Sequence, residues 1–235
     1  MDAPLADARD FVAEHFPQAR WALLAGSVTT SARTPGSDLD IVVRLPDGDA
    51  AAGRSSHRWR GWPVEIFAND LRGHRHFLDI ELAARKPTLH RMIGTGVPLG
   101  EVDGELAGLR EECAKRLAEG PGPVPAEASD WSRYVLTDEL DDYLHSVDPA
   151  ETTLVGTQLW LSAGRAALEF GAHWTGNGKW LLRELRAHDA GLAERWTAAR
   201  DEREALIAFT REVLDRAGGP LFEGYRRSAP KPGTP

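Results

Sequence analysis

Hydrophobic and polar positions follow two different patterns along the chain. Before residue 120, short apolar runs typical of strands alternate with longer stretches that have the spacing of amphipathic helices. The predicted strands are Trp21–Ala25, Asp38–Leu45 and Pro63–Phe67, and the predicted helices cover residues 4–16, 71–93 and 101–119. The first half is therefore expected to combine a small sheet with helices.

The second half has a helical pattern almost throughout. The predicted helices cover residues 130–145, 152–170, 179–199 and 201–216, with Asp148-Pro149 and Gly176-Asn177-Gly178 as connectors. Four helices joined by short links predict an antiparallel bundle.

A break between these two patterns falls at Gly120-Pro121-Gly122-Pro123-Val124-Pro125. Three prolines and two glycines in six residues interrupt any helix or central strand. We therefore predict a first domain over residues 1–122, a helical domain over 123–228 and a disordered tail over 229–235.

Composition narrows the class of protein. The 235 residues are 42% hydrophobic and 27% charged with a net charge of −8, as in ordinary soluble globular proteins. The single cysteine, Cys113, excludes an intramolecular disulfide, and no apolar stretch approaches the roughly 20 residues that span a bilayer. The N-terminal segment lacks the basic start and apolar run of a signal peptide, so a cytoplasmic location is expected.

Charge also bears on the partner. Neither half of the chain has an excess of Lys and Arg over Asp and Glu. Because affinity for nucleic acid comes largely from neutralising phosphates, this balance argues against a DNA or RNA partner.

Candidate chemistry begins where the first predicted strand ends. Gly26 follows that strand and lacks the Cβ that would keep the backbone away from another group. Ser27 is expected to open a helix, with a hydroxyl and backbone N–H groups of the kind that receive phosphate. Ten residues separate Ser27 from Asp38, and Asp40 follows two positions later. A strand would project both acids from one face while Leu39 points to the other. Two adjacent acids repel each other, and a divalent cation such as Mg²⁺ between their oxygens would explain the pair.

A third acid stands in the next predicted strand. Glu65 lies between Val64 and Ile66, which would face the opposite side. A strand adjacent to the first acidic pair could aim Glu65 at the same metal. Three carboxylates, a phosphate-holding Gly-Ser turn and a divalent ion suit in-line attack on a nucleoside triphosphate.

This motif resembles that of the DNA polymerase beta nucleotidyltransferase superfamily. The resemblance rests on Gly26-Ser27, Asp38-x-Asp40 and Glu65, and within the superfamily the chain is similar to the aminoglycoside nucleotidyltransferases, which are adenylyltransferases. It implies an α+β protein, with a small mixed-sheet nucleotidyltransferase domain followed by an all-α helical bundle domain.

The resemblance also implies an activity. Two Mg²⁺ ions would be held by Asp38 and Asp40, with Glu65 as a further ligand or as the base. Ser27 and Ser37 would contact the triphosphate of ATP or another NTP. A nucleoside monophosphate would then pass to an acceptor hydroxyl with release of pyrophosphate, and an aminoglycoside acceptor would give antibiotic resistance.

Two basic residues of the second half are further candidates. Arg165 and Lys179 flank the Gly176-Asn177-Gly178 turn, and Lys179 is one of four lysines in the chain. Related aminoglycoside enzymes hold the triphosphate with basic residues of the helical domain, which implies the same role for this pair.

Two alternatives stay open at this stage. The acceptor could be a protein side chain, as in antitoxin-like nucleotidyltransferases, rather than a small molecule. The chain could also bind a nucleotide without turnover, although a binding module has no need for the third acid.

Overall fold

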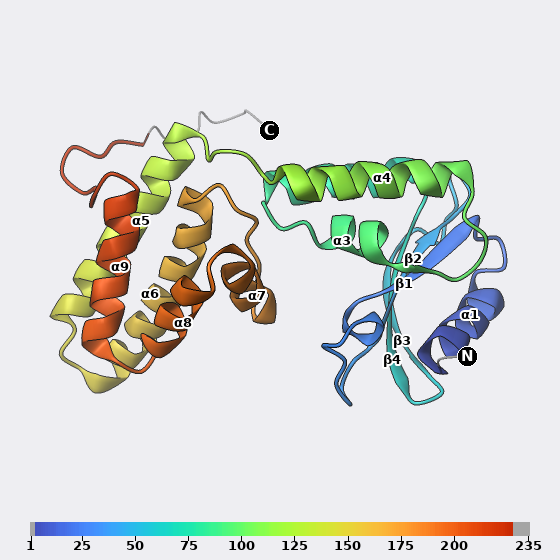
Figure 1. Ribbon diagram of the computed structural model, residues 1–235, viewed down its shortest axis with the longest axis horizontal. Helices are drawn as coiled ribbons and strands as arrows, with labels where there is room; N and C mark the ends of the chain where they lie inside the picture. The colour runs from blue at the N-terminus through green and yellow to red at the C-terminus, as the bar shows by residue number, and fades with distance from the viewer. Residues whose placement is uncertain (1–2, 228–235) are drawn as a thin grey trace. The chain divides into compact units, whose positions relative to one another are not determined.

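The computed structural model describes residues 3–227, and the chain divides into two compact units between Pro121 and Gly122 (Figure 1). The first unit combines a mixed sheet with helices and the second is all-helical, which confirms the α+β prediction. The tail predicted over residues 229–235 lies outside the described residues.

The first unit contains every strand in the part of the chain that the structure describes. Its elements are α1 (Ala3–His15), β1 (Trp21–Ala25), the 3₁₀ turn η1 (Ser27–Thr29), β2 (Leu39–Arg44), β3 (Gly53–Trp59), β4 (Trp62–Asn69), α2 (Leu71–Ala83), α3 (Thr88–Thr95), β5 (Val97–Pro98) and α4 (Gly104–Glu119).

The strands form one sheet in the order β3-β4-β2-β1-β5. β2 and β4 are parallel, and the other neighbouring strands are antiparallel. The chain leaves β2, forms β3 at the edge of the sheet, and returns as β4 through a two-residue turn at Arg60 and Gly61. Both turn residues have positive φ, 48° and 88°, as a type I′ hairpin turn requires. The return places β4 directly beside β2.

Alternation along β2 directs successive side chains into two separate cores. Leu39, Ile41 and Val43 pack with Phe11 of α1 on one face of the sheet. Val42 points to the other face, into a cluster with residues of α2, α3 and α4. Figure 1 shows α1 and α3 on opposite sides of the strands. Burial on both faces fixes the register, because a slip by one residue would exchange the two sets of side chains.

Two long helices predicted from the sequence are interrupted in the structure. The predicted helix over 71–93 becomes α2 and α3, because the chain reverses at Arg85 with φ of 57° and continues through Pro87. The predicted helix over 179–199 becomes α7 and α8, because Asp189 is extended and its carboxylate accepts a hydrogen bond from the Leu192 N–H. The spacing of apolar residues continues across both breaks. A prediction from that spacing alone therefore treats each pair of helices as one.

The second unit contains five helices within the described residues, rather than the four predicted. They are α5 (Ala126–His145), α6 (Pro149–Phe170), α7 (Lys179–His188), α8 (Ala190–Ala198) and α9 (Arg203–Arg216). Their shared core includes a stacked pair of indoles, Trp160 and Trp196, with ring centroids 4.2 Å apart. Each indole N–H donates to the backbone carbonyl of the other residue, at 2.8 and 2.7 Å.

Membrane insertion through a helix finds no support in the described part of the chain. None of the helices over residues 3–227 combines the length and the apolar character that crossing a bilayer requires.

A buried polar network occupies the C-terminal end of β2. The Arg44 guanidinium donates to Glu105 of α4 at 2.9 Å, and the Trp21 indole N–H donates to the same carboxylate at 3.0 Å. His74 is fully buried, and its Nε2–H donates to the Val43 carbonyl at 3.0 Å. Burial, with a smaller contribution from the positive charge of Arg44, lowers the pKa of His74 from 6.5 to about 4.

The low pKa of His74 predicts a loss of stability in mild acid. Between pH 6.5 and about 4 the unfolded chain binds a proton at this residue that the folded protein does not. The free energy of unfolding therefore decreases as the pH is lowered through this range. We expect His74 to account for about 3 kcal/mol of that fall. Urea titrations of the wild type and of His74→Gln, whose amide can donate to the same carbonyl, measure the difference. Equal losses in both proteins over this range would contradict the assignment.

Candidate functional site

Three carboxylates gather at the N-terminal end of β2. Asp38 immediately precedes β2, Asp40 lies within it, and Glu65 lies opposite Asp40 on the parallel strand β4. One oxygen from each residue falls within 4.8 Å of the others, and all three side chains are half-buried. The structure therefore brings together the three acids that the sequence singled out.

Packing on the far side of the sheet explains why these acids share one face. Leu39 and Ile41 are fully buried against α1, as is Ile66 of β4. Because side chains alternate along a strand, burying this set directs Asp40 and Glu65 to the opposite face. Hydrophobic burial, rather than any attraction between the acids, fixes their arrangement.

Gly26 brings the end of β1 against the carboxylate of Asp40. Ala25 is paired with Asp40 in the sheet, and Gly26 turns the chain with φ of 80° and ψ of −168°. A Cβ at Gly26 would overlap the Oδ2 atom of Asp40. The close approach expected from the missing Cβ is therefore present, and its partner is a carboxylate of the acidic cluster.

A pair of hydroxyls lies beside this turn. Ser27 and Ser37 join through their Oγ atoms at 2.8 Å, and Ser37 also accepts a hydrogen bond from the Thr34 N–H at 2.9 Å. Ser27 was expected to begin a helix, but it begins only the single 3₁₀ turn η1, which ends at Thr29. The chain is extended at the next residue, so the longer helix that was expected is absent here. The structure thus offers a hydroxyl pair at this turn rather than the N-terminus of a helix.

Arg54 is a site residue that the sequence analysis did not identify. It lies on β3, and its guanidinium pairs with Glu65 Oε2 at 2.7 Å while lying 4.8 Å from the centre of the Phe67 ring. The segment Gly53–Trp59 lacks apolar alternation, so it was not predicted as a strand. A usable signal was present: Arg60-Gly61 between Trp59 and Trp62 is a two-residue hairpin turn.

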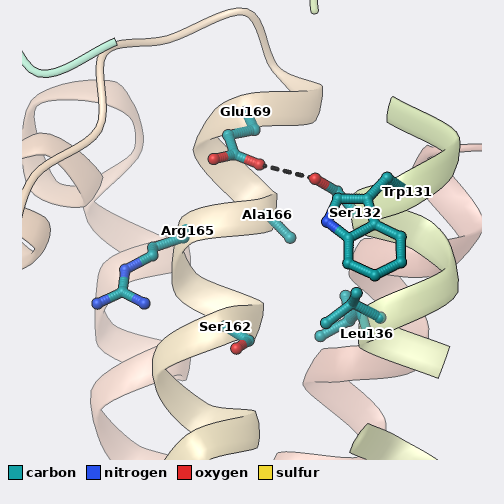
Figure 2. Close-up of a pocket in the computed structure, with 8 residues that line it drawn as sticks. Trp131, Ser132, Leu136, Ser162, Arg165, Ala166 and Glu169 are labelled. Carbon is teal, nitrogen blue, oxygen red and sulfur yellow. Dashed lines mark hydrogen bonds between the residues drawn. The ribbon is translucent and has the colours of Figure 1, made fainter. Parts of the chain in front are cut away.

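The two basic candidates of the second half lie in the helical unit. Lys179 is exposed at the start of α7. Arg165 is half-buried on α6, where it lines a shallow pocket with Trp131, Ser132 and Glu169. Figure 2 shows the Ser132 hydroxyl of α5 directed at the Glu169 carboxylate of α6, to which it donates at 3.2 Å. The Nε atom of Arg165 is buried without a hydrogen-bond partner among the described residues. Their roles as nucleotide ligands stay predictions.

The chemistry of the acidic cluster fits a hard divalent cation. Carboxylate oxygens are the ligands that Mg²⁺ selects, and three acids within 4.8 Å repel one another unless a positive charge lies between them. Arg54 already pairs with Glu65 at 2.7 Å, so one of the three acids has a countercharge within the described residues. The absence of a side chain at Gly26 leaves room for the Asp40 carboxylate in its observed position.

Comparisons with known proteins leave the family open. No protein-family model matches the chain, and no curated protein matches it. Among solved structures, a nucleotidyltransferase-like protein from Exiguobacterium sibiricum aligns with a TM-score of 0.45 and 12% identity. The alignment covers 90% of this chain and 74% of that one. Similarity at this level assigns neither a family nor an activity.

Substitution of Gly26 tests whether its missing side chain shapes the cluster. Gly26→Ala should displace the Asp40 carboxylate and weaken Mn²⁺ binding about tenfold or more, an effect comparable to disturbing the surroundings of metal ligands. Electron paramagnetic resonance of free Mn²⁺ measures the affinity.

Gly61→Ala is the matched control for this substitution. Gly61 also has positive φ, 88°, but its added Cβ would meet no atom within 4 Å. Both variants therefore place a Cβ at positive φ, and Gly26→Ala alone also brings it against Asp40. Similar Mn²⁺ affinities in the two variants would show that the close approach has no part in metal binding.

Proposed function

We propose that the protein is a Mg²⁺-dependent nucleotidyltransferase that transfers a nucleoside monophosphate, AMP from ATP in the first instance, to an acceptor hydroxyl. The observation that carries the proposal is the convergence of Asp38, Asp40 and Glu65 within 4.8 Å, at the start of β2 and the facing position of the parallel strand β4. The Gly26-Ser27 turn beside Asp40 supports it, because the resemblance drawn from the sequence pairs such a turn with an Asp-x-Asp strand.

The three acidic residues are proposed to have different roles. Asp38 and Asp40 would hold the metal, with Glu65 as a further ligand or as the base. When bound, Mg²⁺ would neutralise charge on the phosphates as pyrophosphate departs. The pairing of Asp40 with Ala25 on one side and with Glu65 on the other supports this role, because it fixes Asp40 beside the Gly26 turn and the third acid.

The hydroxyls of the turn are proposed to contact the triphosphate. Ser37 is buried and already accepts the Thr34 N–H, whereas Ser27 is half-buried. Ser27 is therefore the better placed of the two to turn its hydroxyl towards a phosphate oxygen. Arg165 and Lys179 are proposed as further triphosphate ligands, on the strength of the sequence resemblance alone.

One carboxylate oxygen of Glu65 is available to act as a base. Arg54 occupies Oε2, while Oε1 makes no hydrogen bond to any residue that the structure describes. In the base role, Oε1 would take the proton of the acceptor hydroxyl. The acceptor oxygen would bond to the α-phosphorus, the bond to the bridging oxygen would break, and pyrophosphate would leave.

The acceptor is proposed to be a small molecule with a free hydroxyl. An aminoglycoside is the specific acceptor that the sequence resemblance implies, and this assignment rests on that resemblance alone.

Asp40→Asn tests the proposed activity directly. The amide keeps the size of the side chain but removes the charge that would hold the metal, so Mg²⁺-dependent ATP binding and pyrophosphate release should fall by about a hundredfold or more. Calorimetric titration with ATP, with and without Mg²⁺, measures binding, and a coupled phosphate assay measures release.

Asp79→Asn is the control, because Asp79 is an exposed acid on α2 away from the cluster. It should behave as the wild type. Full activity in Asp40→Asn would refute the proposal. Mg²⁺-dependent ATP binding with no pyrophosphate release on any acceptor would instead identify a nucleotide-binding module.

Glu65→Gln separates the two roles open to Glu65. If Glu65 is the base, Mn²⁺ affinity should change by less than about threefold while the transfer rate falls by about 10²–10⁴. If Glu65 is a metal ligand, the affinity itself should fall by about tenfold or more. Electron paramagnetic resonance and single-turnover transfer on the same preparation provide both values. An unchanged affinity together with an unchanged rate would exclude both roles.

A further inference from the structure

A second cavity lies on the face of the sheet that carries the acidic cluster. It has a volume of about 240 Å³ and opens between the β3–β4 edge and helices α2 and α3. Phe67, Phe77, Leu89 and Met92 form most of its wall, and Arg54 lies at its margin. Its lining is therefore largely apolar and partly aromatic.

Two residues that line the cavity, Phe67 and Arg54, are also neighbours of Glu65. Phe67 follows Glu65 by two positions on β4, so both side chains share one face and their Cα atoms are about 7 Å apart. Arg54 touches both, with its guanidinium on Glu65 Oε2 at 2.7 Å and 4.8 Å from the centre of the Phe67 ring. A ligand in the cavity would thus lie one side chain away from Glu65.

The polar groups around the cavity favour an uncharged ligand. Glu81 lines it, but both of its carboxylate oxygens accept the Leu89 N–H, at 2.9 and 2.7 Å, which holds them against the start of α3. Arg54 is committed to Glu65. The side chains of Asn69 and Thr88 also line the cavity, and neither makes a hydrogen bond within the described residues. Apolar walls with an amide and a hydroxyl suit a neutral ring that carries a polar group.

The order of the strands places this cavity opposite the Gly-Ser turn. Gly26 and Ser27 follow β1 on one side of β2, while β4 and β3 lie on the other side. An in-line displacement needs the attacking oxygen and the departing pyrophosphate on opposite sides of the phosphorus. If the triphosphate lies by Ser27, the attacking group comes from the side of β4.

We propose that this cavity binds the acceptor, and that the acceptor is an uncharged alcohol bearing an aromatic or similarly flat apolar ring. The term acceptor rests on the proposed function, whereas binding of the ring does not. A ring-bearing alcohol fits this cavity better than a polycationic sugar, because most of the lining is apolar and Glu81 is the one acidic residue among the described lining residues.

Ligand-observed saturation-transfer NMR with 2-phenylethanol tests the cavity, with glycerol as the polar comparison. The aromatic alcohol should bind and glycerol should not. Phe77→Ala should weaken binding about five- to tenfold, because the ring loses one apolar wall.

Ile80→Ala is the matched control. Ile80 and Phe77 are both on α2 and nearly half exposed, at 48% and 46%, so neither truncation opens the core. Ile80 does not line the cavity, and its variant should bind as the wild type does. Absent binding, or equal weakening in both variants, would overturn the site.

Paramagnetic broadening tests whether the ring lies beside the acidic cluster. With Mn²⁺ in place of Mg²⁺, the ring protons of bound 2-phenylethanol should broaden in the wild type. In Asp40→Asn the broadening should disappear while binding of the alcohol persists. Binding without broadening in a protein that does bind Mn²⁺ would refute the acceptor assignment. Pyrophosphate release would still report on the proposed function separately, as would Mg²⁺-dependent ATP binding.

Discussion

One row of the sheet, formed by Ala25, Asp40 and Glu65, determines the arrangement of the site. Asp40 is paired with Ala25 in the antiparallel direction and with Glu65 in the parallel direction. The register of both pairs is fixed by apolar side chains that alternate with the acids and are buried against α1. A shift of β2 by one residue would bury Asp40 and expose Ile41, so the core and the site depend on the same register.

The conformation of the turn after β1 depends on the row formed by Ala25, Asp40 and Glu65. Ala25 ends the strand opposite Asp40, and Gly26 must then pass the Asp40 carboxylate at a distance that no side chain allows. Its positive φ brings Ser27 close to Ser37, and the bond between their hydroxyls connects the two ends of the intervening loop. A backbone constraint at one residue thus places both an acid and a hydroxyl.

Sequence patterns predicted the strands that contain enough apolar residues to be recognised locally. β1, β2 and β4 were predicted because each contains a short run of mostly apolar residues, and Asp40 and Glu65 were noticeable as the acids within such runs. β3 was missed because an edge strand exposed on one side needs little apolar character, and Arg54 was missed with it. The breaks at Arg85 and Asp189 were missed because apolar periodicity continues across them. Pairing across the sheet, which joins Arg54 to Glu65, is not visible in the local sequence.

The two ends of β2 show how stability and chemistry are separated within one strand. At its C-terminal end, the buried Arg44 finds its countercharge in Glu105, with the Trp21 indole N–H as a further donor to that carboxylate. At the other end, three half-buried acids lie within 4.8 Å of one another, and Arg54 pairs with Glu65. Charges that repel one another are unfavourable in a folded domain, so hydrophobic packing must hold the acidic end in place. The acidic end of β2 is therefore the end to which the proposed metal site is assigned, whereas the polar contacts of the opposite end serve the fold.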